Sequence, residues 1–214
     1  MGLKVNEIYK SVQGESTYTG HPCVFIRLTY CNLRCSYCDT EYAFYEGKEL
    51  SIEEILEKIK AYKINLVEVT GGEPLIQKEC NLLLKKLLSH NYEVLLETSG
   101  SLTLAKVPNK VIKIVDFKCP SSKMESKNLW ENVNYINKKD EIKFVIGNRK
   151  DYNWAKKKIT EHKLFNLTKN ILFSPVFNEI EPKKIIDWIL EDTLKVRFQL
   201  QMHKYIWKPD EKGV

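Results

Sequence analysis

The sequence contains no apolar run that approaches 18 residues, so no membrane-spanning helix is expected. Its first residues, Met1 to Glu7, lack the apolar core of a signal peptide. Low-complexity stretches, internal repeats and linkers rich in proline or glycine are also absent. These absences predict one domain over residues 1–214, located in the cytoplasm and without a membrane partner.

The lysines do not gather into a dense patch, although the formal net charge is +6. A nucleic-acid-binding surface normally concentrates its basic residues, so we expect no nucleic acid partner. A charged, solvated surface explains the surplus, as does a site for small anionic substrates. With 43% hydrophobic and 29% charged residues, the composition is that of an ordinary globular protein.

Short β-like runs alternate with amphipathic helices along most of the chain. Capping and apolar periodicity predict four helices. The first begins after Ser51, and the other three cover about 76–90, 152–162 and 182–191. Period-two alternation and β-branched residues predict eight strands; they cover 5–9, 24–29, 66–70, 93–98, 113–117, 142–146, 171–174 and 196–202. The polar region 122–139 is expected to be a long loop with one helical turn.

Strands that alternate with helices predict an α/β fold with a mostly parallel sheet. The chain is too short for a complete eight-fold barrel, which usually takes about 250 residues. We therefore predict a partial, TIM-like barrel that is open on one side. In such folds the loops at the carboxyl ends of the strands build the active site.

Three cysteines lie within eight residues of one another, at the end of the second predicted strand. Cys31, Cys35 and Cys38 have the spacing CxxxCxxC, whereas the other three cysteines are scattered and are expected to be packed small residues. Three thiolates around a four-iron cluster leave one iron open for a substrate. The alternative, structural zinc, takes four ligands, usually as two separated pairs, and no second pair exists here. The run resembles the radical S-adenosylmethionine superfamily, including the aromatic Tyr37.

A second motif, from Thr70 to Pro74, closes the strand 66–70 with the sequence Thr-Gly-Gly-Glu-Pro. Glycines allow a ligand to approach the backbone closely, while carbonyl groups and Glu73 offer acceptors for an ammonium group. Gly-Gly and Pro also form ordinary turns, so the motif is weak in isolation. Beside the cysteines it resembles the superfamily element that receives the amino group of S-adenosylmethionine.

The flanking segments indicate which reaction follows. Residues 9–16 read Tyr-Lys-Ser-Val-Gln-Gly-Glu-Ser, and Asp39 and Thr40 follow the last cysteine. With the segment 20–28, they resemble the 7-carboxy-7-deazaguanine synthase family. The similarity covers about 6–44, returns at 69–74 and 97–100, and is diffuse afterwards. The chain departs from the family at Ser16 and Tyr30, where glycine is frequent, and at Tyr37, where tryptophan is.

Alternation on the strand 24–29 places Arg27 among apolar neighbours, where its guanidinium needs an anionic partner such as a carboxylate. A solvated strand residue is the alternative. Gln13 and Glu15 can pair with the donor and acceptor edge of a pterin ring. On the last strand, a polar face either lines the cavity or meets water; its members are Arg197, Gln199, Gln201 and His203.

The resemblance implies a radical ring contraction of 6-carboxy-5,6,7,8-tetrahydropterin to 7-carboxy-7-deazaguanine with loss of ammonia, in 7-deazapurine (queuosine-type) biosynthesis. It implies a [4Fe–4S] cluster on the three cysteines and Mg²⁺ held by Thr40. It also implies a homodimer and a one-electron reductant of the flavodoxin type. The implied S-adenosylmethionine contacts are Tyr37, Cys38, Asp39, Gly72, Glu73, Ser99, Ser121, Ser122, Lys123 and Ser174. The implied substrate contacts are Val12, Gln13, Gly14, Glu15, Arg27 and Thr70.

Two other functions stay open at this stage. An activase that installs a glycyl radical on a partner enzyme shares the small size and the cysteine motif, but it would not need Gln13, Glu15 and Arg27. A non-catalytic zinc or iron–sulfur module in an RNA-modification complex would bind metal without cleaving S-adenosylmethionine.

Overall fold

A single curved sheet organises the chain in the computed structural model, which describes residues 2–214. Its strand order is β3-β1-β2-β4-β5-β6-β7-β8-β9. The strand β1 is antiparallel to β2 and β3, whereas all pairs from β2 to β9 are parallel. The strands are β1 Gly2–Val12, β2 Pro22–Leu28, β3 Lys48–Ser51, β4 Leu66–Gly71, β5 Glu93–Thr98, β6 Ile112–Asp116, β7 Glu141–Ile146, β8 Asn170–Pro175 and β9 Arg197–Phe198. The predicted α/β architecture, a partial barrel with a mostly parallel sheet, is confirmed.

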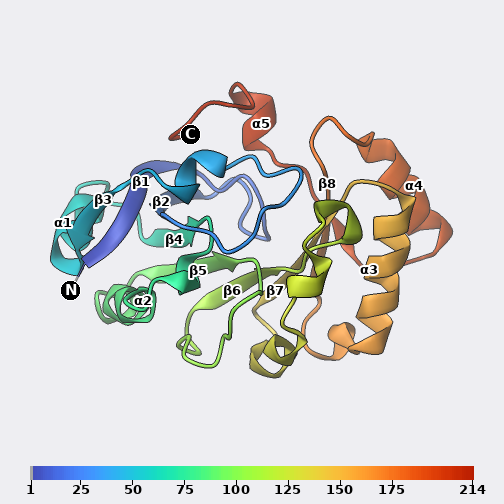
Figure 1. The fold of residues 1–214 in the computed structure, drawn as a ribbon, viewed down its shortest axis with the longest axis horizontal. Helices are drawn as coiled ribbons and strands as arrows, with labels where there is room; N and C mark the ends of the chain where they lie inside the picture. The colour runs from blue at the N-terminus through green and yellow to red at the C-terminus, as the bar shows by residue number, and fades with distance from the viewer. Residues whose placement is uncertain (1) are drawn as a thin grey trace.

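Four helices follow the outer side of the sheet, and a short fifth helix lies on the other side, near the C-terminus (Figure 1). They are α1 Ile52–Lys60, α2 Cys80–Ser89, α3 Arg149–Glu161, α4 Pro182–Glu191 and α5 His203–Ile206. Short 3₁₀ turns connect them: η1 Glu41–Phe44, η2 Pro74–Ile76, η3 Pro120–Ser122, η4 Glu125–Lys127, η5 Trp130–Tyr135 and η6 Leu164–Asn166. Within residues 2–214, no helix is both long enough and apolar enough to cross a membrane.

The helix predictions are confirmed with altered bounds. The capping box of α1 forms between Ser51 and Glu54, and α4 has the predicted limits. The predicted helix 76–90 begins only at Cys80, because Gln77 is extended and its side chain bonds the backbone of Lys4 and Thr29. These bonds tie the chain after β4 to β1.

Three strand and loop predictions needed correction. The predicted strand 196–202 is β-paired only at Arg197–Phe198, because Gln199 and the residues after it turn toward the cavity and bond the loop after β1. The short edge strand β3 was not predicted. The region 122–139 contains the turns η4 and η5 where one helical turn was expected.

The two faces of the sheet carry different side chains. Outward positions pack with the helices into the main core, where Ile26, Val69 and Phe144 are fully buried. A smaller apolar cluster fills the inside of the barrel near the amino ends of the strands. Its members are Cys23, Phe25, Leu66, Leu95, Ile112 and Ile114. Toward the carboxyl ends, the same inward rows continue with polar side chains.

A buried ion pair stabilises the sheet at the opposite end from the cavity. Lys113 Nζ lies 2.7 Å from Asp140 Oδ2, and the two side chains are 1% and 0% exposed. Asp140 also accepts hydrogen bonds from the backbone N–H groups of Lys113 and Asn137. A charge at this depth is tolerated only while its partner is present.

The pair predicts an asymmetric response to mutation. Asp140→Ala leaves the Lys113 ammonium buried and unpaired, so it should lower the free energy of unfolding by about 3–5 kcal/mol. Lys113→Met should cost less, because backbone donors still satisfy Asp140. Denaturant unfolding of both variants measures the difference. Equal losses would contradict the role given to Asp140.

Candidate active site

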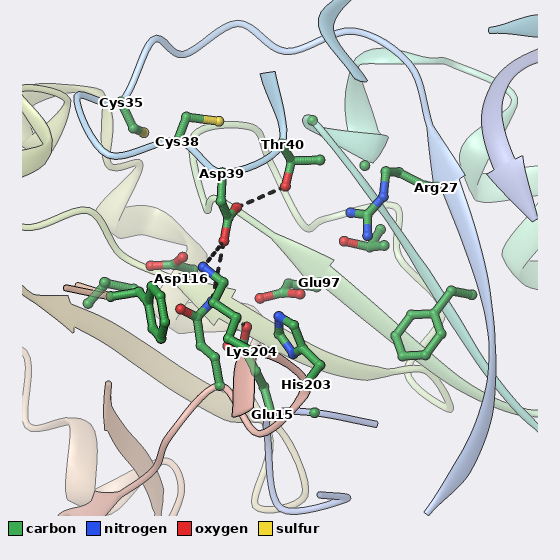
Figure 2. Close-up of a pocket in the computed structure, with 18 of the residues that line it drawn as sticks. Glu15, Arg27, Cys35, Cys38, Asp39, Thr40, Glu97, Asp116, His203 and Lys204 are labelled. Carbon is green, nitrogen blue, oxygen red and sulfur yellow. Dashed lines mark hydrogen bonds and ion pairs between the residues drawn. The ribbon is translucent and has the colours of Figure 1, made fainter. Parts of the chain in front are cut away.

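The carboxyl ends of the parallel strands open into a cavity of about 760 Å³. This size is typical of small-molecule sites. Figure 2 shows Cys35 and Cys38 at one side of it, Arg27 at another, and Glu15, Glu97 and His203 together. The predicted residues that line it are Val12, Gln13, Gly14, Glu15, Arg27, Cys31, Cys35, Tyr37, Cys38, Asp39, Thr40, Thr70, Gly72 and Ser99. The predicted residues outside its lining are Glu73, Ser121, Ser122, Lys123 and Ser174.

The cysteine loop follows β2 and presents three partly exposed thiols to the cavity. The backbone holds their arrangement: Leu33 N–H donates to Cys31 Sγ, and Cys38 N–H donates to the carbonyl of Cys35. Burial raises the pKa of all three thiols, to about 11 for Cys35, while the Lys118 ammonium opposes this rise. Binding of iron to these groups therefore displaces protons.

The donor set fits a cluster with an open iron better than a single metal ion. Three thiols meet at one cavity, while Cys23, Cys80 and Cys119 are completely buried, as expected for packed residues. In residues 2–214, no three His, Cys, Asp or Glu side chains converge closely enough for one metal ion. Three thiolates match the supply for a four-iron cluster that keeps one iron free.

The turn after β4 lies directly against the cysteine loop. A Cβ on Gly72 would come within 2.3 Å of the Tyr30 carbonyl oxygen and 2.7 Å of Cys31 Cβ. Glu73 N–H donates to that same carbonyl. The Glu73 carboxylate is fully buried and accepts hydrogen bonds from Leu75, Thr98 and Ser99, which anchors the turn to β5. Gly71 and Gly72 therefore line the cavity, whereas this carboxylate does not.

Three buried polar atoms near the cavity lack a hydrogen-bond partner in residues 2–214. They are Tyr37 Oη, Asp116 Oδ1 and Ser174 Oγ. Burial, followed by the Asp116 charge, raises the pKa of Tyr37, so its hydroxyl keeps its proton. Unpaired polar groups of this kind are costly unless water or a ligand satisfies them. Tyr37 and Asp116 line the cavity and lie close to Cys35, a position that fits a polar cofactor such as S-adenosylmethionine, whereas Ser174 lies outside the lining.

Arg27 crosses one wall of the cavity and already has a carboxylate partner. Its Nε lies 2.7 Å from Glu7 Oε1, and one terminal nitrogen donates to Tyr9 Oη at 3.1 Å. The expected anionic partner is thus partly supplied by Glu7, a residue that the sequence did not single out. The other terminal nitrogen donates to no group in residues 2–214 and remains available to a ligand.

Gln13 and Glu15 follow β1 and hold each other in place. Gln13 donates to Glu68, and its side-chain oxygen accepts from the N–H of Glu15. Glu15 in turn accepts from Lys143 at 2.8 Å and from Gln201 at 3.0 Å. Both side chains line the cavity, as predicted, and both are fixed by neighbours from other strands.

The sequence did not single out the charged residues on the cavity floor. Glu68, Glu97, Asp116 and Lys143 occupy successive inward positions near the ends of β4, β5, β6 and β7. Charged residues at alternate positions of otherwise apolar strands are the signal that would have found them. The same alternation had identified Arg27.

The C-terminal segment after β9 crosses the cavity and contacts the chain just after the cysteines, at Asp39, and the loop after β1, at Gly14. Lys204 Nζ lies 2.5 Å from Asp39 Oδ2, and the other oxygen of Asp39 accepts from Thr40 Oγ1 at 2.9 Å (Figure 2). The Lys204 ammonium overcomes the effect of burial and lowers the pKa of Asp39. The ring of His203 packs so closely on Gly14 that a Cβ there would lie 2.2 Å from Nδ1. Of the polar face predicted on the last strand, Gln201 and His203 line the cavity, whereas Arg197 is exposed and Gln199 is buried outside the lining.

Gly72 gives a direct test of the contact between the two loops. Gly72→Ala should push the turn away from Cys31 and lower the free energy of unfolding by about 1–3 kcal/mol. It should also reduce the iron and sulfide bound per chain after anaerobic reconstitution. Gly147→Ala is a matched control, since its Cβ would meet only side-chain atoms, at 3.0 Å or more. Normal iron content in Gly72→Ala would contradict this contact.

Comparisons with known proteins agree with this geometry. The family model described as "Radical SAM superfamily" matches residues 25–189. A 7-carboxy-7-deazaguanine synthase from Koribacter versatilis is 45% identical, over 99% of this chain and 100% of that protein. The enzyme of the same name from Chlorobaculum tepidum is 43% identical, over 99% of this chain and 97% of its own length.

Among solved structures, QueE from Escherichia coli matches with a TM-score of 0.79, at 22% identity and over 95% of each chain. SuiB of Streptococcus suis bound to S-adenosylmethionine matches with a TM-score of 0.55, at 13% identity, over 80% of this chain and 45% of that one. These two likenesses show the fold. The extent and identity of the sequence matches show more: the chain belongs to the 7-carboxy-7-deazaguanine synthase family of the radical S-adenosylmethionine superfamily.

Proposed function

We propose that this protein is a 7-carboxy-7-deazaguanine synthase, a carbon–nitrogen lyase that contracts the ring of 6-carboxy-5,6,7,8-tetrahydropterin and releases ammonia. One observation supports this most strongly. The three thiols, the Gly72 turn and the free guanidinium nitrogen of Arg27 all face one cavity. The thiols and the Gly72 turn suit the iron–sulfur cluster and S-adenosylmethionine, and the Arg27 nitrogen suits a substrate carboxylate.

The cofactors have separate places in the cavity. Cys31, Cys35 and Cys38 would hold the [4Fe–4S] cluster, which when bound supplies the electron for cleavage of S-adenosylmethionine. The carbonyls of the turn at Gly72 would accept the amino group of S-adenosylmethionine, and the Tyr37 hydroxyl would supply a polar contact. Thr40 would offer its hydroxyl to Mg²⁺, which prefers oxygen ligands and keeps several waters.

The remaining residues orient the pterin. Arg27 binds the carboxylate through the nitrogen that Glu7 and Tyr9 leave free. Glu15 faces the N–H donors of the ring as an ionised acceptor, because Lys143, His203 and Gln201 overcome the effect of burial and lower its pKa to about 2. The Lys204–Asp39 ion pair holds the C-terminal segment across the cavity, where it restricts the entry of water.

The proposal extends to the setting in which the enzyme works. A one-electron reductant of the flavodoxin type would reduce the cluster, and the enzyme would act as a homodimer. Its location would be the cytoplasm, where a reducing environment maintains free thiols such as the six of this chain.

Product analysis tests the activity. The chain, reconstituted without oxygen, is incubated with dithionite, S-adenosylmethionine, Mg²⁺ and the carboxytetrahydropterin. Mass spectrometry should detect 7-carboxy-7-deazaguanine together with 5′-deoxyadenosine. Deoxyadenosine without deazapurine would refute this substrate and leave an activase or another radical enzyme. A colourless protein that binds zinc instead of iron would refute the radical chemistry.

Arg27 tests the pterin site separately. Arg27→Ala should lower kcat/KM for the pterin about 10- to 100-fold, the effect of losing a charged hydrogen bond. Iron content should stay at the parent level, because Arg27 contacts no cysteine. Arg149→Ala, an exposed arginine on α3, serves as the matched control. Loss of iron in Arg27→Ala would mean that Arg27 is structural.

A further inference from the structure

Lys143 is an enclosed ammonium group at the bottom of the cavity. Its side chain is 6% exposed. The Nζ atom lies 2.8 Å from Glu15 Oε2 and 3.7 Å from Asp116 Oδ2, and it also contacts Glu97 Oε1. These three carboxylates come from different parts of the fold: the loop after β1, the strand β5 and the strand β6. One cation therefore joins the loop after β1 to the neighbouring strands β5 and β6.

The other cations of the cavity are each paired elsewhere. Lys118 Nζ lies 2.7 Å from Asp116, Arg27 bonds Glu7, and Lys204 bonds Asp39. These pairs leave Lys143 as the ammonium group available to Glu15 and Glu97 among residues 2–214. The charged and titratable groups that face this pair of carboxylates are Lys143, Glu68, Glu141 and the His203 imidazole, while Asp116 contacts Lys143 and is itself paired with Lys118.

Both carboxylates keep acceptor capacity toward the cavity. Glu15 Oε1 accepts from Gln201, while Glu97 Oε2 accepts from no group in residues 2–214. The side chain of Glu97 is 25% exposed and lines the cavity. The aminopyrimidinone edge of a pterin carries adjacent N–H donors, and an ionised carboxylate, which is an acceptor at both of its oxygens, matches such a pair of donors.

We propose that Lys143 is a positioning residue for the pterin: through its contacts with both carboxylates it holds Glu15 and Glu97 side by side as paired acceptors for the N–H groups of the ring. The proposal rests on the proposed function, because it takes the pterin as the ligand of these carboxylates. Lys143 itself stays behind the two carboxylates and acts through them.

Glu68 shows what happens to a carboxyl group here without its own ammonium. It is 2% exposed, and its side-chain hydrogen bond comes from the neutral amide of Gln13. Burial, together with the charges of Glu97 and Glu15, raises its pKa well above the ordinary value. Glu15 shows the opposite shift, because the charge of Lys143 overcomes the effect of burial and lowers the pKa of Glu15. Conversely, Glu15, Glu97 and Asp116 overcome the effect of burial and raise the pKa of Lys143, so the ammonium stays charged.

Removal of the ammonium should therefore produce a defect that depends on pH. In Lys143→Met the carboxylate of Glu15 keeps the effect of burial and loses the charge that most strongly opposes it, so its pKa should rise and it should bind a proton that it releases as pH rises. The KM for the pterin, relative to the parent, should rise about 10- to 100-fold near pH 6. This ratio should decline toward about pH 8.5, since the acceptor form returns above the raised pKa. Because KM is divided by that of the parent in the same buffer, any effect of His203 titration that both proteins share cancels.

Two further readouts separate this role from a structural one. Lys143→Arg restores the charge, so its KM ratio should be smaller and should not change with pH. Infrared spectra of Lys143→Met should show a protonated carboxyl band that disappears as pH rises and that is additional to the band Glu68 contributes in both the variant and the parent. Glu97→Gln in the same background should change this band. Iron content and the melting temperature report whether the variants are folded.

The outcomes distinguish the two proposals. A KM ratio that does not change with pH, or an infrared spectrum of Lys143→Met without a protonated carboxyl band additional to that of the parent, would overturn the role of Lys143. If Lys143→Met is too unstable to assay, Lys143→Arg still decides, because a pH-dependent defect despite its permanent charge would overturn the role. If Lys143→Met shows the infrared band but the parent makes no deazapurine, the proposed function and the role in pterin binding are both refuted. The effect of Lys143 on carboxylate ionisation would remain.

Discussion

The Glu73 carboxylate is the interaction on which the arrangement of the site depends. It is fully buried and accepts from Leu75, Thr98 and Ser99, so it joins the end of β4 to the end of β5. This junction fixes the glycine turn, and the turn fixes the cysteine loop through the carbonyl of Tyr30. A carboxylate with several strong donors is stable at this depth, whereas an unpaired one would not be. One acidic side chain thus sets the distance between the cluster ligands and the cofactor turn.

A second constraint comes from the parallel strands. Inward positions are apolar near the amino ends, where Phe25 and Ile114 pack, and charged near the carboxyl ends, where Arg27 and Asp116 lie. The apolar half stabilises the barrel, and the charged half lines the cavity. Because neighbouring strands are parallel, the inward residues of their carboxyl-terminal halves converge on the same space. This placement explains how Lys143 reaches carboxylates from three elements.

The sequence predicted the parts of the site that depend on local patterns. Cysteine spacing, strand alternation and the capping signal at Ser51 are local, and the cysteine loop, the inward side of Arg27 and α1 were found correctly. Pairings between distant residues were not predictable in this way. The approach of Lys143 to Glu15 joins positions 128 residues apart, and Lys204 meets Asp39 across 165 residues. Such pairs follow from how far the barrel curves and where the C-terminal segment crosses it.

The two positions where glycine was expected show how tertiary contacts overrule local preference. Ser16 has φ 64° and Tyr30 has φ 80°, in the region that glycine adopts most easily. For tyrosine this backbone costs about 1–2 kcal/mol. Tyr30 N–H donates to Ala43 and its carbonyl accepts from Glu73, while Ser16 N–H donates to Gln199. The loops keep the conformation that the site requires because these bonds fix the backbone on both sides of the cavity. Strain retained beside a buried site indicates that the position of the loop matters more than its local stability.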